Sequence, residues 1–170
     1  MGAPHEAEIV ACIPSLRRYA RGLAHDPERA DDLVQDTLER AWQRFSLWQR
    51  RGAVRAWMFG IMHNLHIDRL RSQRRSREDA VDDDFADTTA GAATVDRLEL
   101  RDLERALQRL PVEHREVLLL VGVEELSYKE IAAVIGVPIG TVMSRLSRAR
   151  ERLRAELDGR PQAARIQRVK

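Results

Sequence analysis

Apolar residues recur at intervals of three and four along most of the chain, the spacing of one face of an α-helix. The longest such pattern lies between residues 27 and 45, where Asp26 can cap a helix and Pro27 can take its first position. The same spacing predicts helices over about residues 6–24, 53–74, 96–110 and 112–123, with Pro14 kinking or restarting the first. The chain is therefore expected to be all-α.

The stretch from Leu126 to Leu153 predicts two further helices joined by a sharp turn. Ser127 and Glu130 have the spacing of a capping box. Gly136 can adopt the left-handed conformation and Pro138 cannot continue a helix, so the first helix should end beforehand. The second helix has an apolar stripe formed by Val142, Leu146, Ala149 and Leu153. This arrangement is typical of a DNA-reading helix-turn-helix.

Arginine is concentrated in two places. The second helix of the helix-turn-helix carries Arg145, Arg148, Arg150, Arg152 and Arg154, and the end of the 53–74 helix carries Arg69, Arg71, Arg74, Arg75 and Arg77. Both clusters can bind phosphates. The alternatives are a solvated helix on a small bundle and an arginine bias that reflects only a GC-rich genome.

An acidic segment separates these two basic parts. Residues 77–95 break every periodicity and hold six acidic residues against one arginine, which predicts a flexible linker. The predicted organisation is a helical domain at 1–76, the linker at 77–95, a four-helix domain at 96–157 and a tail at 158–170. A flexible linker of this length spans about 25 Å, and roughly 65 Å when extended, so the domains could occupy separate sites.

Composition narrows the classes of function. No apolar run approaches the roughly 20 residues that cross a bilayer, and the N-terminus lacks the order of a signal peptide, so we expect a cytoplasmic protein without membrane insertion. Cys12 is the only cysteine, and His63 and His66 have no partners at metal-ligand spacing. The sequence contains no phosphate loop, cofactor motif or nucleophile with a base. We therefore expect no metal, no cofactor and no enzymatic activity.

The order of these motifs resembles the sigma-70 superfamily of bacterial transcription initiation factors. The resemblance is to the extracytoplasmic-function (ECF) group, which keeps only regions two and four. It covers roughly residues 6–155 and is carried by residues 32–38, 55–71, 110–120, 127–132 and 136–150. It implies two small helical domains: a three- to four-helix bundle (region two) and a four-helix domain with the helix-turn-helix (region four), joined by the flexible acidic linker.

The resemblance also implies roles for residues of the first half. The predicted 27–45 helix has an acidic face that holds Asp32, Gln35, Asp36 and Glu39. By itself such a face is usually only a solvated surface. In this family, however, the corresponding face docks on core RNA polymerase. The predicted loop at 46–52, with an exposed aromatic, and the following helix would open the minus-ten promoter element. The residues implied for this element are Trp48, Arg51, Asn64, Arg71, Arg74 and Arg75. Asn64 would contact an extruded base, the arginines would hold phosphates, and Trp57 would support the fold.

In the second half, the resemblance places the last helix in the major groove of the minus-thirty-five element. The implied contacts are Thr141, Met143, Ser144, Arg145, Ser147, Arg148 and Arg152. Arg145 and Arg152 would clamp phosphates and the others would read bases. Met143 departs from the family pattern, which commonly has Lys or Arg there; a methionine could contact a thymine methyl or lose a phosphate contact.

The expected function is that of a noncatalytic sigma factor that binds core RNA polymerase, directs it to promoter DNA and promotes melting through residues 46–75. An anti-sigma factor is an implied further partner. The alternative is a stand-alone helix-turn-helix regulator that binds duplex DNA as a dimer, with residues 1–76 as its sensor or dimerisation domain. An RNA-modifying or nuclease function would need an acid-base or metal site that the sequence does not show.

Overall fold

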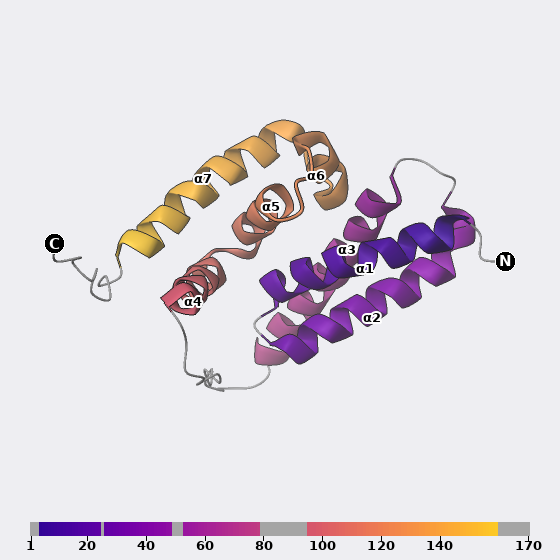
Figure 1. The fold of residues 1–170 in the computed structure, drawn as a ribbon, viewed down its shortest axis with the longest axis horizontal. Coiled ribbons are helices and arrows are strands. Elements are labelled where there is room, and N and C mark those ends of the chain that lie inside the picture. Colours follow the sequence, from indigo (N-terminus) through magenta and orange to yellow (C-terminus); the bar gives the residue numbers. More distant parts are fainter. Residues whose placement is uncertain (1–3, 25, 49–52, 79–94, 160–170) are drawn as a thin grey trace.

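The computed structural model describes residues 4–24, 26–48, 53–78 and 95–159. These ranges form helices joined by turns, without a strand, which confirms the all-α fold (Figure 1). The helices are α1 (Pro4–Leu23), α2 (Pro27–Arg44), the 3₁₀ helix η1 (Phe45–Leu47), α3 (Val54–Glu78), α4 (Val95–Arg109), α5 (Val112–Gly122), α6 (Tyr128–Ile135) and α7 (Ile139–Asp158).

Helix α1 is continuous through Pro14, so the predicted kink or restart is wrong. Pro14 is exposed and has no N–H to donate to the Val10 carbonyl. Val10 is also exposed, so this carbonyl lies on the water-accessible side of the helix. The opposite side is buried and includes Cys12, confirming its expected place as a small apolar residue of the core. A proline on a hydrated helix face can therefore be accommodated without a break.

Helix α2 matches the predicted pattern, except near its end. The side chain of Asp26 accepts a hydrogen bond from the Glu28 N–H at 3.0 Å, as expected of an N-cap. Trp42, which continues the apolar spacing that predicted this helix, is 48% exposed rather than buried. The first residues of the loop expected at 46–52 belong to the 3₁₀ helix η1 instead. Trp48, expected to be exposed, is half-buried. Trp42 and Trp48 both pack on Phe45, and Phe45 and Trp48 also pack against the main core.

Helix α3 continues to Glu78, beyond the predicted end at 74 and the predicted domain limit at 76. The arginine-rich segment is thus a helical extension whose side chains reach solvent, not the start of the linker. Helix α4 begins at Val95. Most of the predicted linker, residues 79–94, lies outside the described residues, as does the tail from residue 160.

In the second half, the capping box and the left-handed glycine form as expected. Ser127 Oγ accepts from the Glu130 N–H, and the Glu130 carboxylate accepts from the Ser127 N–H at 2.8 Å. Gly136 has φ +69°, and α7 starts after Pro138. In α4 the leucines whose spacing predicted the helix form a stripe that is not buried over its first part, because Leu98, Leu100 and Leu103 are exposed. Helix α4 packs on α7 and touches α1, which leaves that stripe uncovered.

The two halves of the chain pack directly against each other, with α6 against α3 and α5 against α1 (Figure 1). Their buried apolar residues form one continuous core. At one crossing the approach is close enough that a Cβ on Gly22 would lie 2.7 Å from both methyl carbons of Leu119. The sequence predicted two domains able to separate; this structure shows them closed.

A set of polar side chains lies along the boundary between the halves, and we call it the polar seam. It consists of Arg18, Tyr19, Arg55 and His63 from the first half and Glu116 and Glu124 from the second. Glu116 Oε1 accepts from the Tyr19 hydroxyl at 3.0 Å and lies 2.5 Å from His63 Nδ1. Glu124 Oε2 accepts from Arg55 at 2.9 Å and from Arg18 at 3.3 Å. Glu116 and Glu124 of the second half thus have their hydrogen-bond partners in the first half.

Arg115 joins the same boundary through helix ends rather than through a carboxylate. Its buried guanidinium donates to the Leu23 carbonyl at the end of α1 and to the carbonyls of Leu107, Gln108 and Leu110 around the end of α4. Burial lowers the pKa of Arg115. A cation at the negative ends of two helices is electrostatically favourable, so Arg115 fixes α1, α4 and α5 together.

We expect the free energy of unfolding to fall as pH drops from 6.5 towards 4. Burial lowers the pKa of His66 to about 4, so the folded chain keeps the ring neutral while the unfolded chain takes up a proton below pH 6.5. The stability contribution is complete above pH 6.5, and its loss approaches roughly 3 kcal/mol near pH 4. Urea unfolding at pH 7, 5.5 and 4.5 measures it. His66→Leu should flatten this dependence; an identical pH slope would exclude His66 as its source.

Candidate DNA and polymerase interfaces

Helix α7 presents the predicted minus-thirty-five residues on its outer side. Val142, Leu146 and Ala149 are buried against the domain, as the apolar stripe required. The exposed residues are Met143, Ser144, Ser147, Arg148 and Arg152, whereas Thr141 and Arg145 are half-buried. All seven predicted residues lie on this helix. Met143, Ser144 and Ser147 form a ridge along its outer side, and the exposed Glu151 follows Ser147 one turn further on.

One flank of this ridge is basic. His114 at the start of α5 lies close to Arg152, Arg148 and Arg145. Burial lowers the pKa of His114 most, and the positive charges of these three arginines lower it further. Arg145, Arg148 and Arg152 are spaced three and four residues apart, so they lie along one side of α7, the helix on which α5 packs. A strand of DNA beside the ridge would meet a row of guanidinium groups there.

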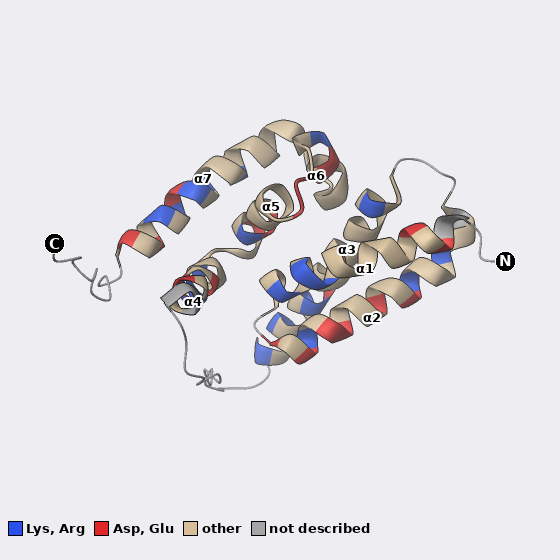
Figure 2. Cartoon of the chain, in the orientation of Figure 1, with Lys and Arg blue, Asp and Glu red and all other residues tan. Residues whose placement is uncertain are grey.

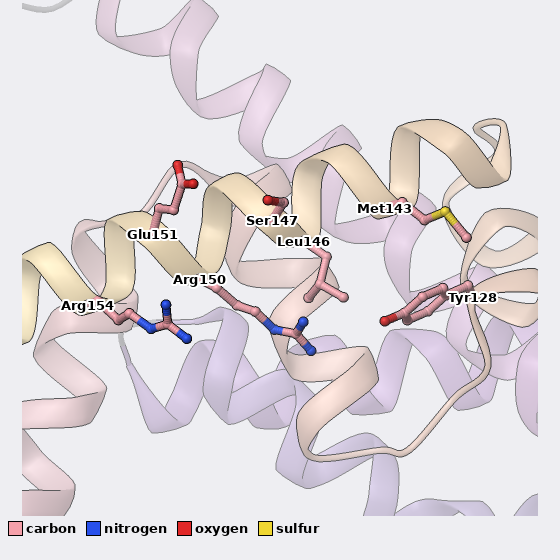
Figure 3. A pocket seen from close by; sticks show the side chains of 7 residues that line it. All are labelled: Tyr128, Met143, Leu146, Ser147, Arg150, Glu151 and Arg154. Atoms are coloured by element: carbon pink, nitrogen blue, oxygen red, sulfur yellow. The ribbon is translucent and has the colours of Figure 1, made fainter.

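The other flank borders an open hollow of about 250 Å³ between α7 and the start of α6 (Figure 3). Met143, Ser147, Arg150 and Arg154 line it from α7, and Tyr128 stands opposite Met143. Arg150 and Arg154 follow Met143 at helical spacing, so they continue its stripe. The ridge is thus flanked by arginines on both sides. The sequence pattern showed Arg150 and Arg154 as part of the basic cluster but did not place them on this side of the ridge.

The predicted minus-ten residues lie along α3. Asn64 is exposed on the outer side of the helix, and Arg71, Arg74 and Arg75 are exposed near its end. Arg71 lies 4.0 Å from Asp68 in a solvent-exposed pair, which contributes little to stability. Arg51 lies outside the described residues. The helix therefore has one polar base-contact candidate followed by a basic segment.

An aromatic row connects the end of α2 to the start of α3. Phe45 stacks on Trp48 with centroids 6.1 Å apart, and Trp48 stacks on Trp57 at 5.6 Å. Trp42 meets the edge of Phe45 at 6.3 Å. Trp48 is held between two rings and does not project freely, so its predicted DNA contact would use only its remaining exposed edge. Trp57 is half-buried in this row, consistent with a supporting role.

The acidic face of α2 is open to solvent over its length (Figure 2). Asp32, Gln35, Asp36 and Glu39 are all exposed there. They are not equivalent, because Asp36 pairs with Arg69 of α3 at 2.5 Å while Glu39 accepts from Gln43 in its own helix. Asp36 therefore also helps to hold α2 on α3.

The polar seam was not identified from the sequence. Glu116 ends the polar run from Glu113 and directly precedes the apolar run that begins at Val117, so no local pattern distinguishes it from a solvated residue. Arg55 and His63 could be placed only as facing outward or sideways. Their partners follow them by 53 residues or more, a separation that no local pattern spans.

Two further properties bear on the type of protein. No single helix in the described ranges is both long and apolar enough to cross a bilayer; α6 and α7 reach that composition only as a pair, bent by 100°. Among the same residues, no three His, Cys, Asp or Glu side chains come together as a potential metal site.

Comparison with known proteins agrees with this geometry. Residues 9–63 match the family described as the Sigma2 domain of PhyR, and residues 100–153 match sigma-70, region 4. The chain is 41% identical over 151 residues to the ECF RNA polymerase sigma factor EcfG of Rhodopseudomonas palustris, covering 88% of this chain and 83% of that protein.

Solved structures give the same answer. The sigma factor RpoE of Bartonella quintana, solved with the anti-sigma factor NepR, superposes with a TM-score of 0.77 at 34% identity over 91% of this chain and 96% of that one. The protein CnrH, solved with the cytosolic domain of CnrY, superposes with a TM-score of 0.68 at 29% identity over 90% and 86%. By sequence and fold, the chain belongs to the ECF group of sigma-70 RNA polymerase sigma factors.

Proposed function

We propose that this chain binds core RNA polymerase, directs it to specific promoters and promotes melting of the start-site duplex, without catalytic chemistry of its own. The observation that carries this proposal is the ridge on α7, which is narrow, partly apolar and flanked by arginines on both sides. A helix in the major groove has a phosphate strand on each side of it, and this arrangement matches that requirement.

The acidic face of α2 supplies the second contact. Exposed carboxylates on a rigid helix can dock on a basic helical surface, and electrostatic complementarity of this kind sets both specificity and association rate. Asp32 is the central candidate, because Asp36 already pairs with Arg69. Docking of α2 on core polymerase is consistent with membership in the family. It would take place in the bacterial cytoplasm, where transcription occurs.

An anti-sigma factor is the proposed regulatory partner. The relative from Bartonella quintana was solved in complex with one, NepR, and that relative aligns over nearly the whole of this chain. The stand-alone regulator gains no support, since the close relatives are named as RNA polymerase sigma factors.

In vitro transcription tests the function directly. Purified bacterial core polymerase is supplied with a library of promoter fragments, with and without the chain. Promoter-specific transcripts that depend on the chain are expected. If DNA binding is tight without polymerase and no such transcript forms, the sigma function is wrong and the dimeric regulator is favoured.

Asp32→Arg should weaken binding to core polymerase, because it places a positive charge on the proposed docking face. Fluorescence titration of labelled chain with core polymerase measures the dissociation constant, and an increase of about tenfold corresponds to 1.4 kcal/mol. Glu104→Arg, which makes the same charge change on exposed α4, is the matched control and should bind normally. Equal weakening by both variants would show a general charge effect instead of a contact.

Asn64→Ala should reduce open-complex formation while leaving core binding unchanged. Asn64 is exposed on α3, and loss of its hydrogen bonds to an extruded base should cost about 1–3 kcal/mol. Permanganate reactivity of the melted strand reports opening. Gln73→Ala, on the same helix, is the control. Normal melting by Asn64→Ala would remove this residue from the minus-ten site.

Arg148→Ala should relax sequence preference in the minus-thirty-five element by about 1–3 kcal/mol if it makes a bidentate base contact. Arg154→Ala, at the edge of the α6 hollow, should weaken binding equally on all sequences and lower the salt dependence of binding, as expected for a phosphate contact. Promoter libraries with every base of the element varied distinguish the two. An unchanged preference at every position would exclude Arg148 as a reader.

A further inference from the structure

Two large apolar side chains at the start of α7 stay exposed although this helix already has a buried stripe. Val142, Leu146 and Ala149 fill the core, whereas Ile139 and Met143 are 41% and 50% exposed and lie outside it. The two are four residues apart, so they adjoin on one side of the helix. We call this pair the apolar patch. Its own domain leaves it about half uncovered, so a bound partner can still bury it.

The apolar patch lies at the end of α7 that carries no charge. The helix begins at Ile139, directly after Pro138, and its first six residues, 139–144, contain no charged side chain. All the arginines of α7 follow, from Arg145 onwards. In a helix-turn-helix the first residues of the second helix reach the base edges. The uncharged start of α7 is therefore the part that meets bases, and the basic remainder is the part that meets phosphates.

Hydrogen-bond donors are scarce at this uncharged start. The Ser144 hydroxyl donates to the Thr141 carbonyl at 3.1 Å, so its proton is used within the helix, and Thr141 is itself half-buried. Gly140 has no side chain, and apart from its own turn of helix no atom of the described chain lies within 4 Å of where its Cβ would be. A base edge can approach closely here, and the large side chains that it meets are apolar.

Thymine is the base that fits such a surface. In the major groove thymine presents a C5 methyl, whereas the reading groups of the other three bases are hydrogen-bond donors and acceptors. Burying those groups against Ile139 and Met143 would leave them unpaired, which costs free energy. Met143 has a flexible thioether that can follow a methyl, and Tyr128 stands opposite it on the α6 side (Figure 3).

We propose that Ile139 and Met143 read the C5 methyl of a pyrimidine, so that the minus-thirty-five element carries thymine opposite the start of α7. This inference rests on the proposed function, in which α7 enters the major groove. It assigns Met143 a base contact in place of the phosphate contact of a lysine or arginine. Because 5-methylcytosine carries the same methyl, the group recognised is the methyl and not the rest of the base.

Replacing thymine by deoxyuridine tests the patch, because this change removes only the methyl. The chain in complex with core polymerase is titrated with a promoter that gives transcripts in the in vitro assay. Each thymine of the minus-thirty-five element, on either strand, is replaced singly by deoxyuridine. At a thymine that faces the patch, the dissociation constant should rise about fourfold, which corresponds to about 0.8 kcal/mol for one buried methyl group.

Variants of the patch should abolish this difference at the same position. With Met143→Ala or Ile139→Ala, the ratio of the deoxyuridine to the thymine dissociation constant should fall from about four towards one. Met143→Lys should also lose the ratio, while its new charge makes binding more dependent on salt. Arg154→Ala is the matched control on the same helix: it should weaken binding to both duplexes and keep the ratio.

A cytosine arm separates the methyl from the rest of the base. Where deoxyuridine weakens binding, the T·A pair is replaced by C·G and, separately, by 5-methylcytosine·G. The 5-methylcytosine duplex should bind about fourfold more tightly than the cytosine duplex. Equal binding of these two duplexes would show that the methyl itself is not the group recognised.

The remaining outcomes also decide the proposal. If no deoxyuridine replacement weakens binding, or if both alanine variants keep the ratio, Ile139 and Met143 do not read a methyl, although specific transcription would leave the sigma function intact. If no promoter gives transcripts, the sigma function fails, and the same replacements are made in a duplex that the chain binds without polymerase. A chain that binds no specific duplex at all refutes the patch as well.

Discussion

The arrangement of this chain depends on a short segment of α5 that pairs with the other half. Arg115 donates to the carbonyl ends of α1 and α4, and Glu116 accepts from Tyr19 and lies against His63. Neighbouring residues of one helix thus provide a buried cation and a buried anion. Glu116 finds both its partners in the other half, and Arg115 adds one bond across the boundary to three within its own half. The remaining contacts, including the Leu119 crossing at Gly22 and the pairing of Glu124 with Arg55, follow from where this segment places α5 and the turn after it.

This constraint explains how one chain can expose its binding surfaces and still be closed. The seam uses residues of α1, α3, α5 and the turn before α6, and leaves free the outer sides of α2 and α7. The acidic face of α2 and the arginine-flanked ridge of α7 are therefore both available in the closed form, at a fixed separation.

The polar character of the seam also bears on stability. The apolar core is continuous across the halves, so closure contributes to the folded state. Yet burial of Glu116, Glu124 and the neighbouring His66 costs solvation free energy, and His66 is kept neutral because of it. The boundary is consequently the part of the core whose stability is most sensitive to charge and to pH. The apolar contacts within each half do not depend on protonation.

The sequence by itself determined the elements and most of the outward-facing residues. Capping at Asp26 and Ser127, the left-handed turn at Gly136 and the apolar stripes of α2 and α7 are local features, because their partners lie within a few residues. Local periodicity missed the continuity of α1 through Pro14 and the exposure of Trp42, because both depend on which helix face meets water. Only the tertiary structure decided that Asp36 pairs with Arg69, that Arg150 and Arg154 border the hollow beside Tyr128, and that Glu116 and Glu124 are buried. These contacts join residues far apart in the chain, and their partners are selected by how the halves pack.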